Sequence, residues 1–299
     1  GIAWNLSDLY ASVDDPRIDA DLLEVERRCR AFAERFRGLF AAERLTEAEL
    51  LAALGEYESL AEVMSKLGSY SGLITAADTV DPAKRKLEDR VRQSLVEREN
   101  ELTFFELGWL EVQDDVAARM ADDPVLANYR HYLTSARRYQ PHTKSESEEQ
   151  LLNQKSLTAR AAWIDLFDEF VASLQFKLDY AGETRTLTQP AILALSYDPD
   201  RGLRKAAQEC FFTELSQHEL LLSSVFNAVA QDHGINDGIR RYESPMASRH
   251  LANEVSPPVV DRMLEVAEAN YDIAHRYYRL KARLLGLGKL ATYDQYAPV

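Results

Sequence analysis

Apolar side chains recur every three or four residues along almost the whole chain, and this spacing restricts the possible folds more than any other feature. The first such segment begins near Pro16 and ends near Gly38, and its apolar positions are Ile18, Leu22, Val25, Cys29, Phe32 and Phe36. A helix with one apolar side buries that side against other helices. The sequence therefore predicts a mostly α fold of long antiparallel helices.

The spacing changes in one place. Residues 176–188, FKLDYAGETRTLT, alternate apolar and polar side chains around Ala181 and Gly182, which is typical of two strands joined by a tight turn. We therefore predict one small β-hairpin. After it the sequence predicts a short helix at 190–195, a long helix at 198–232, a glycine-containing loop at 233–246 and a final long helix from Pro257.

The composition limits the classes of partner. With 46% apolar and 28% charged residues, the chain has the make-up of a globular protein. Its formal net charge of −14 argues against nucleic acid and against an anionic membrane surface, because both require a basic face. The longest apolar run, at 220–230, is too short and too polar to cross a bilayer. We expect neither nucleic acid nor membrane as a partner.

The two cysteines, Cys29 and Cys210, both lie in helical patterns among apolar neighbours. Reduced thiols buried in this way are typical of cytosolic proteins, whereas secreted domains of small size use their cysteines in disulfides. We therefore expect a cytoplasmic protein.

Residues 217–222 read QHELLL, and His-Glu is the first half of the HExxH motif, in which two histidines one helical turn apart bind zinc. The position of the second histidine is taken by Leu222, which has no lone pair to donate. His218 falls on the apolar side of the predicted helix, four residues after Glu214. We therefore expect His218 to be a packed histidine that hydrogen-bonds Glu214, and the match to HExxH to be accidental.

The other histidines offer no local metal site. None has a second histidine three or four residues away, and none forms the Glu-x-x-His pair of di-iron helix bundles. Glycine-rich nucleotide motifs are absent, and neither cysteine has an adjacent histidine or cysteine that would activate it. By themselves, the residues predict a helical domain without an active site of its own.

Four blocks of sequence form a set: WNLSDLY at 4–10, residues 141–170 beginning PHTKSESEEQ, the hairpin followed by SYDPDRGLRKAAQE at 196–209, and residues 242–299 ending YDQYAPV. In this order they resemble the N-terminal region of oligoendopeptidase F, a zinc metallopeptidase family related to thimet oligopeptidase. The resemblance extends over essentially the whole chain.

The resemblance implies that the catalytic HExxH helix and a third, glutamate ligand come after Val299 in the family's order. We therefore expect no catalytic residue and no metal ligand in this chain, no zinc bound by it, and no activity from the chain alone. It also implies one mostly helical region over 1–299, with a helical subdomain in 1–140 and helices plus the hairpin in 141–299. The full-length enzyme would use zinc, a bound water and a glutamate base to hydrolyse short unstructured oligopeptides.

The resemblance further implies that the long helices form one wall of a deep channel, which admits an extended oligopeptide and excludes a folded protein. The expected partners are oligopeptide substrates and the protein's own C-terminal catalytic domain. An acidic wall would suit peptides that carry Lys or Arg. The residues expected to line the channel are Tyr293, Asp294 and Tyr296 near the end of the chain, and His250 and Asn253 in the stretch RHLANEV.

Other interpretations remain open from the residues alone. The stretch RHLANEV can instead fasten the preceding loop to the last helix, because polar residues at such junctions usually satisfy backbone groups. The whole chain can also be a stand-alone helical adaptor that binds a peptide in a groove without catalysis. A third alternative is a helical bundle that holds a metal with buried carboxylates and histidines.

Overall fold

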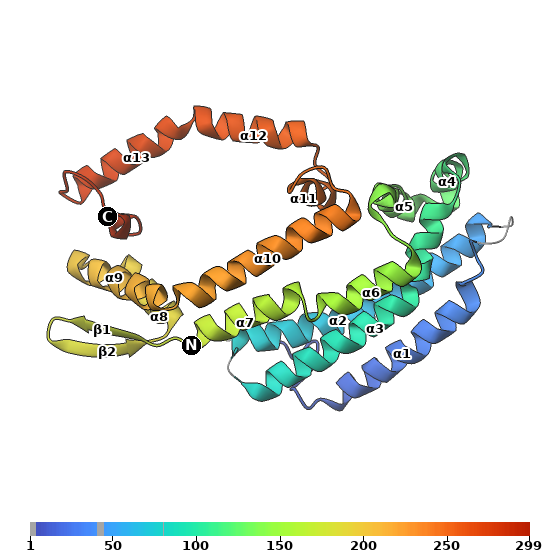
Figure 1. The fold of residues 1–299 in the computed structure, drawn as a ribbon, viewed down its shortest axis with the longest axis horizontal. Coiled ribbons are helices and arrows are strands. Elements are labelled where there is room, and N and C mark those ends of the chain that lie inside the picture. Colours follow the sequence, from blue (N-terminus) through green and yellow to red (C-terminus); the bar gives the residue numbers. More distant parts are fainter. Residues whose placement is uncertain (1–3, 41–44, 80) are drawn as a thin grey trace. The chain divides into compact units, whose positions relative to one another are not determined.

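The computed structural model describes residues 4–40, 45–79 and 81–299, and these residues form helices and a single two-stranded antiparallel sheet (Figure 1). The predicted mostly α fold with one β-hairpin is therefore confirmed. The chain divides into two compact units, Gly1–Ala162 with Asp232–Leu251, and Trp163–Gln231 with Ala252–Val299. The predicted division at residue 140 stays a prediction.

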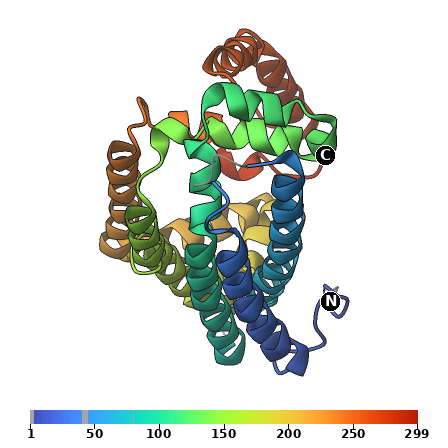
Figure 2. The ribbon, with the colours of Figure 1, turned by 90° about the vertical axis from the view of Figure 1, so that its right-hand side faces the viewer.

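Three long helices, α1, α2 and α3, pack side by side in the first unit (Figures 1 and 2). They span Pro16–Phe36, Glu47–Ala77 and Pro82–Glu111. Each begins at a side chain that caps its first free amides, and for α2 this is the capping box of Thr46 and Glu49. The shorter helices that follow in the chain are α4 (Asp114–Ala121), η1 (Pro124–Tyr129), α5 (Arg130–Arg137), η2 (Gln140–His142) and α6 (Glu146–Ser156).

The centre of this unit is aromatic. The ring of Phe32 on α1 is fully buried and lies edge-on to Phe105 of α3, with their centroids 5.3 Å apart. Phe36, Tyr57 and Phe104 surround the same ring. Aromatic side chains contribute large buried areas to a core, so the spacing that predicts α1 also identifies its buried side.

The elements of the second half of the chain include the hairpin. They are α7 (Arg160–Ser173), β1 (Phe176–Tyr180), β2 (Glu183–Leu187), α8 (Gln189–Ala194), η3 (Leu195–Tyr197), α9 (Arg201–Gln217), α10 (Glu219–Arg240), α11 (Ala247–Ala252), α12 (Pro257–Ala269), α13 (Tyr271–Leu284) and η4 (Thr292–Asp294). The hairpin turns at Ala181 and Gly182, whose φ angles of 53° and 82° are the left-handed values that a two-residue turn requires. Phe176 and Leu178 of β1 are buried against α9.

Two of the long predicted helices are interrupted. The helix expected at 198–232 ends at Gln217 and starts again at Glu219, because His218 leaves the helical conformation at φ −112° and ψ 18°. The prediction of a loop at 233–246 is wrong for the first half of that stretch, which is helical because α10 continues to Arg240. Glycines in that stretch cost helix stability without preventing a helix.

The final predicted helix is broken at Asn270, which separates α12 from α13. The side-chain amide of Asn270 donates a hydrogen bond to the Val266 carbonyl at 2.7 Å. An asparagine side chain that bonds to nearby backbone in this way competes with the helical hydrogen bonds. The spacing of apolar residues nevertheless continues on both sides of the interruption.

Candidate functional site

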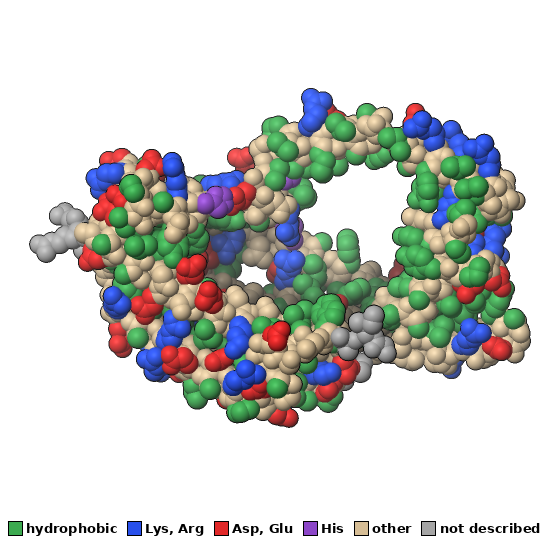
Figure 3. Space-filling model, turned by 180° about the vertical axis from the view of Figure 1, so that it is seen from behind, with side chains coloured by type: hydrophobic (Ala, Val, Ile, Leu, Met, Phe, Trp, Pro, Cys, Tyr) green, Lys and Arg blue, Asp and Glu red, His purple; other side chains and the backbone are tan. Residues whose placement is uncertain are grey.

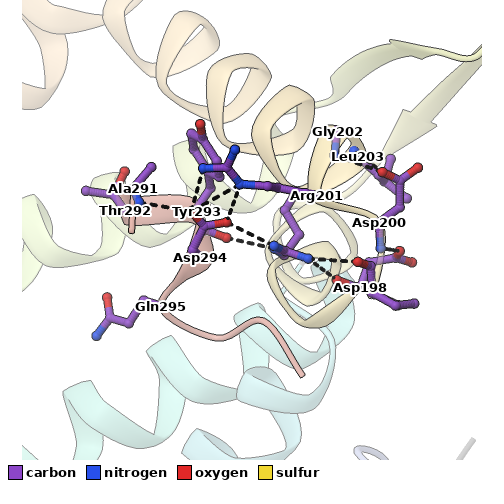
Figure 4. Close-up of polar contacts among 12 residues, drawn as sticks. Asp198, Asp200, Arg201, Gly202, Leu203, Ala291, Thr292, Tyr293, Asp294 and Gln295 are labelled. Atoms are coloured by element: carbon purple, nitrogen blue, oxygen red, sulfur yellow. Dashed lines mark hydrogen bonds and ion pairs between the residues drawn. The ribbon is translucent and has the colours of Figure 1, made fainter. Parts of the chain in front are cut away.

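The last turn of the chain is fastened to the beginning of α9. Asp200 caps this helix by accepting a hydrogen bond from the Gly202 amide at 2.8 Å. Arg201 and Arg204 follow at a spacing of three residues, so both side chains leave the same side of the first turn. Figure 4 shows the polar contacts between Arg201 and Asp294. Both reach the 3-10 turn η4, which carries Asp294.

Asp294 is completely buried, with an exposed fraction of 0%, and its two carboxylate oxygens have several donors. Oδ1 accepts from Arg201 Nε and from Arg204 Nη2, both at 2.9 Å. Oδ2 accepts from Arg201 Nη2 at 2.8 Å and from the Ala291 amide at 2.9 Å. These charge-assisted hydrogen bonds are the stronger kind, and we call the group of Arg201, Arg204 and Asp294 the tail clamp.

Arg204 holds more than the carboxylate. Its Nε donates to the Tyr293 carbonyl at 2.9 Å, and its Nη1 donates to the carbonyls of Asp198 and Pro199 at 2.8 and 3.1 Å. The side chain is 2% exposed. A buried guanidinium with this many partners fixes the loop before α9 and the tail to each other.

The hydrogen bonds from Arg201, from the Ala291 amide and from Arg204 hold the pKa of Asp294 well below its usual value, although burial alone would raise it. The carboxylate is therefore ionised at neutral pH, and its oxygens are occupied by the clamp. As arranged here, it stabilises the tail.

Two tyrosines next to the clamp present their rings differently. The Arg201 guanidinium lies over the ring of Tyr293, 5.2 Å from its centroid. Tyr296 is 51% exposed, and its ring lies 5.1 Å from that of Tyr197, which is also exposed. This exposed pair is the kind of surface on which an apolar peptide side chain can pack. The structure thus brings Tyr293, Asp294 and Tyr296 together on one turn, and their place in a substrate channel stays a prediction.

The remaining predicted site residues lie elsewhere in the chain. His250 is half-buried in α11, and Asn253 is exposed just after the end of that helix. The two belong to different compact units. Their role in a channel, like the alternative role of RHLANEV as a fastening for the loop, stays a prediction.

The QHELLL stretch gives a histidine at a helix junction. His218 is half-buried, its Nε2 lies 3.3 Å from Oε1 of Glu214, and its ring lies edge-on to Phe170 at 4.8 Å. The predicted local pairing with Glu214 is confirmed. Within residues 4–40, 45–79 and 81–299, no three His, Cys, Asp or Glu side chains are grouped in a way that could hold a metal ion.

The partners of Asp294 were not predicted from the sequence. Arg201 and Arg204 are separated from it by about ninety residues of chain, and no local spacing relates them. A second unpredicted contact lies in the first unit, where Arg240 forms two hydrogen bonds to the carboxylate of Glu149, at 2.9 and 2.8 Å. The signal that would have pointed to both contacts is that their residues lie within or next to the stretches 141–170, 196–209 and 242–299, which carry the resemblance.

In the part of the chain that is described, none of the helices is both long enough and apolar enough to cross a membrane.

Comparisons with known proteins agree on one group of enzymes. The family described as Oligopeptidase F matches residues 109–176. An oligoendopeptidase F homolog of Lactococcus lactis is 23% identical over 302 residues, covering 100% of this chain and 49% of the relative. The group B oligopeptidase PepB of Streptococcus agalactiae is 21% identical, covering 99% of this chain and 49% of the relative.

The fold is also that of a solved structure. The crystal structure of oligoendopeptidase-F from Enterococcus faecium superimposes with a TM-score of 0.82 at 23% identity, covering 95% of this chain and 56% of that one. The chain spans about half the length of the curated relatives that it matches. The resemblance to the N-terminal half of oligoendopeptidase F is therefore confirmed.

Proposed function

We propose that this chain is the N-terminal, channel-wall part of a zinc metalloendopeptidase that hydrolyses short unstructured oligopeptides. The observation that carries the proposal is the match of the whole chain, from end to end, to one half of proteins named oligoendopeptidase F, together with the shared fold. Enzymes of this name cleave oligopeptides, and the other half of each relative is available for the catalytic chemistry.

The described residues do not fit a zinc site. They contain no suitable group of metal-binding side chains, and the oxygens of the buried Asp294 are taken by Arg201, Arg204 and the Ala291 amide. We therefore assign zinc and its catalytic glutamate to a C-terminal part, and we expect this chain alone to be inactive. In a complete enzyme zinc would polarise the scissile carbonyl.

The contribution of this chain is the selection and placement of the peptide. The tail clamp fixes η4 by buried, charge-assisted hydrogen bonds, so the rings of Tyr293 and Tyr296 are held on a rigid turn. A rigid wall lowers the entropy cost of holding an extended peptide. His250 and Asn253 are proposed as further wall residues, and the net charge of −14 supports a preference for peptides carrying Lys or Arg.

We also propose that the enzyme works in the cytoplasm. The support is that Cys29 and Cys210 are both free thiols, as expected in a reducing compartment.

The test of the channel uses the protein extended through the residues that follow Val299. One cleavable sequence is presented twice, first as a short internally quenched peptide and then inside a stable folded domain. We expect cleavage of the peptide alone, loss of cleavage with a chelator and recovery with zinc. Equal cleavage of the folded presentation would show that no narrow channel selects the substrate.

The matched variant is Tyr296→Ala, compared with Tyr271→Ala, because both rings are just over half exposed and only Tyr296 adjoins the clamp. We expect Tyr296→Ala to raise KM by about tenfold, the effect of losing one buried aromatic contact of about 1.4 kcal/mol. An unchanged KM for Tyr296→Ala would remove this residue from the proposed wall.

A further inference from the structure

The helices α12 and α13 expose an apolar face. Its side chains recur at intervals of four and three residues within each helix, with one interval of seven across the break at Asn270, and each is between 45% and 61% exposed. Figure 3 shows hydrophobic side chains gathered along these helices, at the top of the view. We call this face the α12–α13 stripe, and its members are Val259, Met263, Val266, Ile273, Tyr277, Leu280 and Leu284.

The stripe has the size of the apolar patches that often mark functional surfaces. Seven apolar side chains, each about half exposed, present on the order of 600 Å² of apolar surface, which equals the largest patch on a typical monomer. A stable interface uses about 800 Å² from each partner, so the stripe is close to one complete half of an interface. None of its members is charged, which fits the desolvated centre of an interface.

The tail of the chain lies against α13. Lys281 and Ala282 are buried on this helix, and Lys281 Nζ donates a hydrogen bond to the Gln295 carbonyl at 2.8 Å. Asp294, the next residue back, is held by the tail clamp. A polypeptide segment that follows Val299 would therefore start near α13, the helix that carries four of the stripe's side chains.

We propose that the α12–α13 stripe is the docking surface for the C-terminal half of the full-length protein. The proposal rests on the proposed function, in which that half carries the catalytic chemistry. The relatives are about twice as long as this chain, so a segment of the required size exists in proteins of this kind. The tail clamp then has a clear role, because it sets the point from which the docking half departs.

Tethering favours this occupant over a second copy of the chain. A short connection gives a linked partner an effective concentration of about a millimolar. A second copy at about a micromolar would have to bind the stripe roughly a thousandfold more tightly to compete.

Hydroxyl-radical footprinting of the methionines tests the proposal. Met263 is 61% exposed within the stripe, Met246 is 51% exposed outside it, and Met64 and Met120 are buried references. In the 1–299 chain, Met263 and Met246 should oxidise at similar rates, far above those of the buried pair. In the extended protein, we expect the oxidation rate of Met263 to fall by about tenfold because the core of an interface excludes water.

A pair of variants separates docking from folding. Leu280→Lys places a charge in the stripe, and Leu23→Lys places the same charge on an exposed position of α1. Neither should change the unfolding midpoint of the 1–299 chain, since both side chains are solvent-accessible there. In the extended protein only Leu280→Lys should restore the fast oxidation of Met263.

Several results would overturn the proposal. One is an unchanged oxidation rate of Met263 in the extended protein. Another is protection of Met263 in the 1–299 chain, which would indicate a second copy if it grows with protein concentration and the chain's own first unit if it does not. A third is protection that appears only when peptide is added, which would indicate that the stripe binds substrate. Footprinting needs no catalysis, so an extended protein without peptidase activity that still protects Met263 would refute the proposed function alone.

Discussion

Removing the carboxylate of Asp294 should release the tail from α9. In Asp294→Ala, Arg204 keeps its bonds to the carbonyls of Asp198, Pro199 and Tyr293 but loses its ion pair with Asp294, and in the parent its side chain is 2% exposed. Breaking a buried ion pair by removing one partner costs about 3–5 kcal/mol. Arg204 keeps its carbonyl partners, so we expect the lower end of this range, a loss of about 3 kcal/mol in the free energy that holds the tail.

Hydrogen exchange measures this loss locally. The tail can detach without unfolding the rest of the chain, so the amides that donate to the carbonyls of η4 should report the free energy of the clamp. The Ala297 amide donates to the Asp294 carbonyl at 3.2 Å, and the Gln295 amide donates to the Thr292 carbonyl at 3.2 Å. A loss of about 3 kcal/mol should accelerate their exchange by roughly a hundredfold.

The matched control is Glu209→Ala on α9, which removes an exposed carboxylate 3.7 Å from Lys205. An exposed pair of this kind contributes at most about 1 kcal/mol, so exchange of the same amides should hardly change. Asp294→Asn keeps a hydrogen-bond acceptor and loses the charge. Its exchange rates should therefore lie between those of Glu209→Ala and Asp294→Ala. An exchange rate in Asp294→Ala within threefold of the parent's would show that the clamp does not hold the tail.

Further predictions concern stability and thiol chemistry. Because the folded-state pKa of Asp294 is lowered, the ionised carboxylate should contribute its full share to the free energy of unfolding above the unfolded-state pKa near 3.9. This contribution should disappear as the pH falls through the lower folded-state pKa. The free energies of unfolding of the parent and of Asp294→Asn, measured in urea, should therefore converge towards acid pH. Thr46→Ala removes the capping box of α2 and should lower the free energy of unfolding by about 1 kcal/mol in urea titrations; no change would mean that the cap contributes nothing. Phe32→Ala should cost about 3–5 kcal/mol in the same assay. Burial raises the pKa of Cys29 to about 11, so a thiol reagent at neutral pH should modify Cys210, which is only half-buried, well before Cys29, and the opposite order would contradict the packing of α1.

The spacing of apolar residues was sufficient to predict the helices that pack on one another and their buried sides. In α1, the positions predicted to be apolar and inward include Ile18, Val25 and Phe32, and all three are buried. Such spacing reports the direction of side chains over several turns, so a single interrupted residue does not alter it. This is why the breaks at His218 and Asn270 were not predicted.

The tail clamp could not be predicted from local sequence patterns, for a different reason. Its arginines are at the start of α9 and its carboxylate is at η4, so the contact depends on the path of the chain between them. Asp294 was singled out only through the resemblance, as a residue near the catalytic segment. Its buried pairing with Arg204 required coordinates.

In the proposed function, this chain is one half of a zinc peptidase and holds no active site itself. The most direct test measures zinc content and cleavage of an internally quenched oligopeptide for two proteins, the 1–299 chain and the protein extended beyond Val299. We expect no bound zinc and no turnover for the 1–299 chain, and about one zinc per molecule with chelator-sensitive turnover for the extended protein. Metal-dependent cleavage by the 1–299 chain, or none by the extended protein, would contradict it.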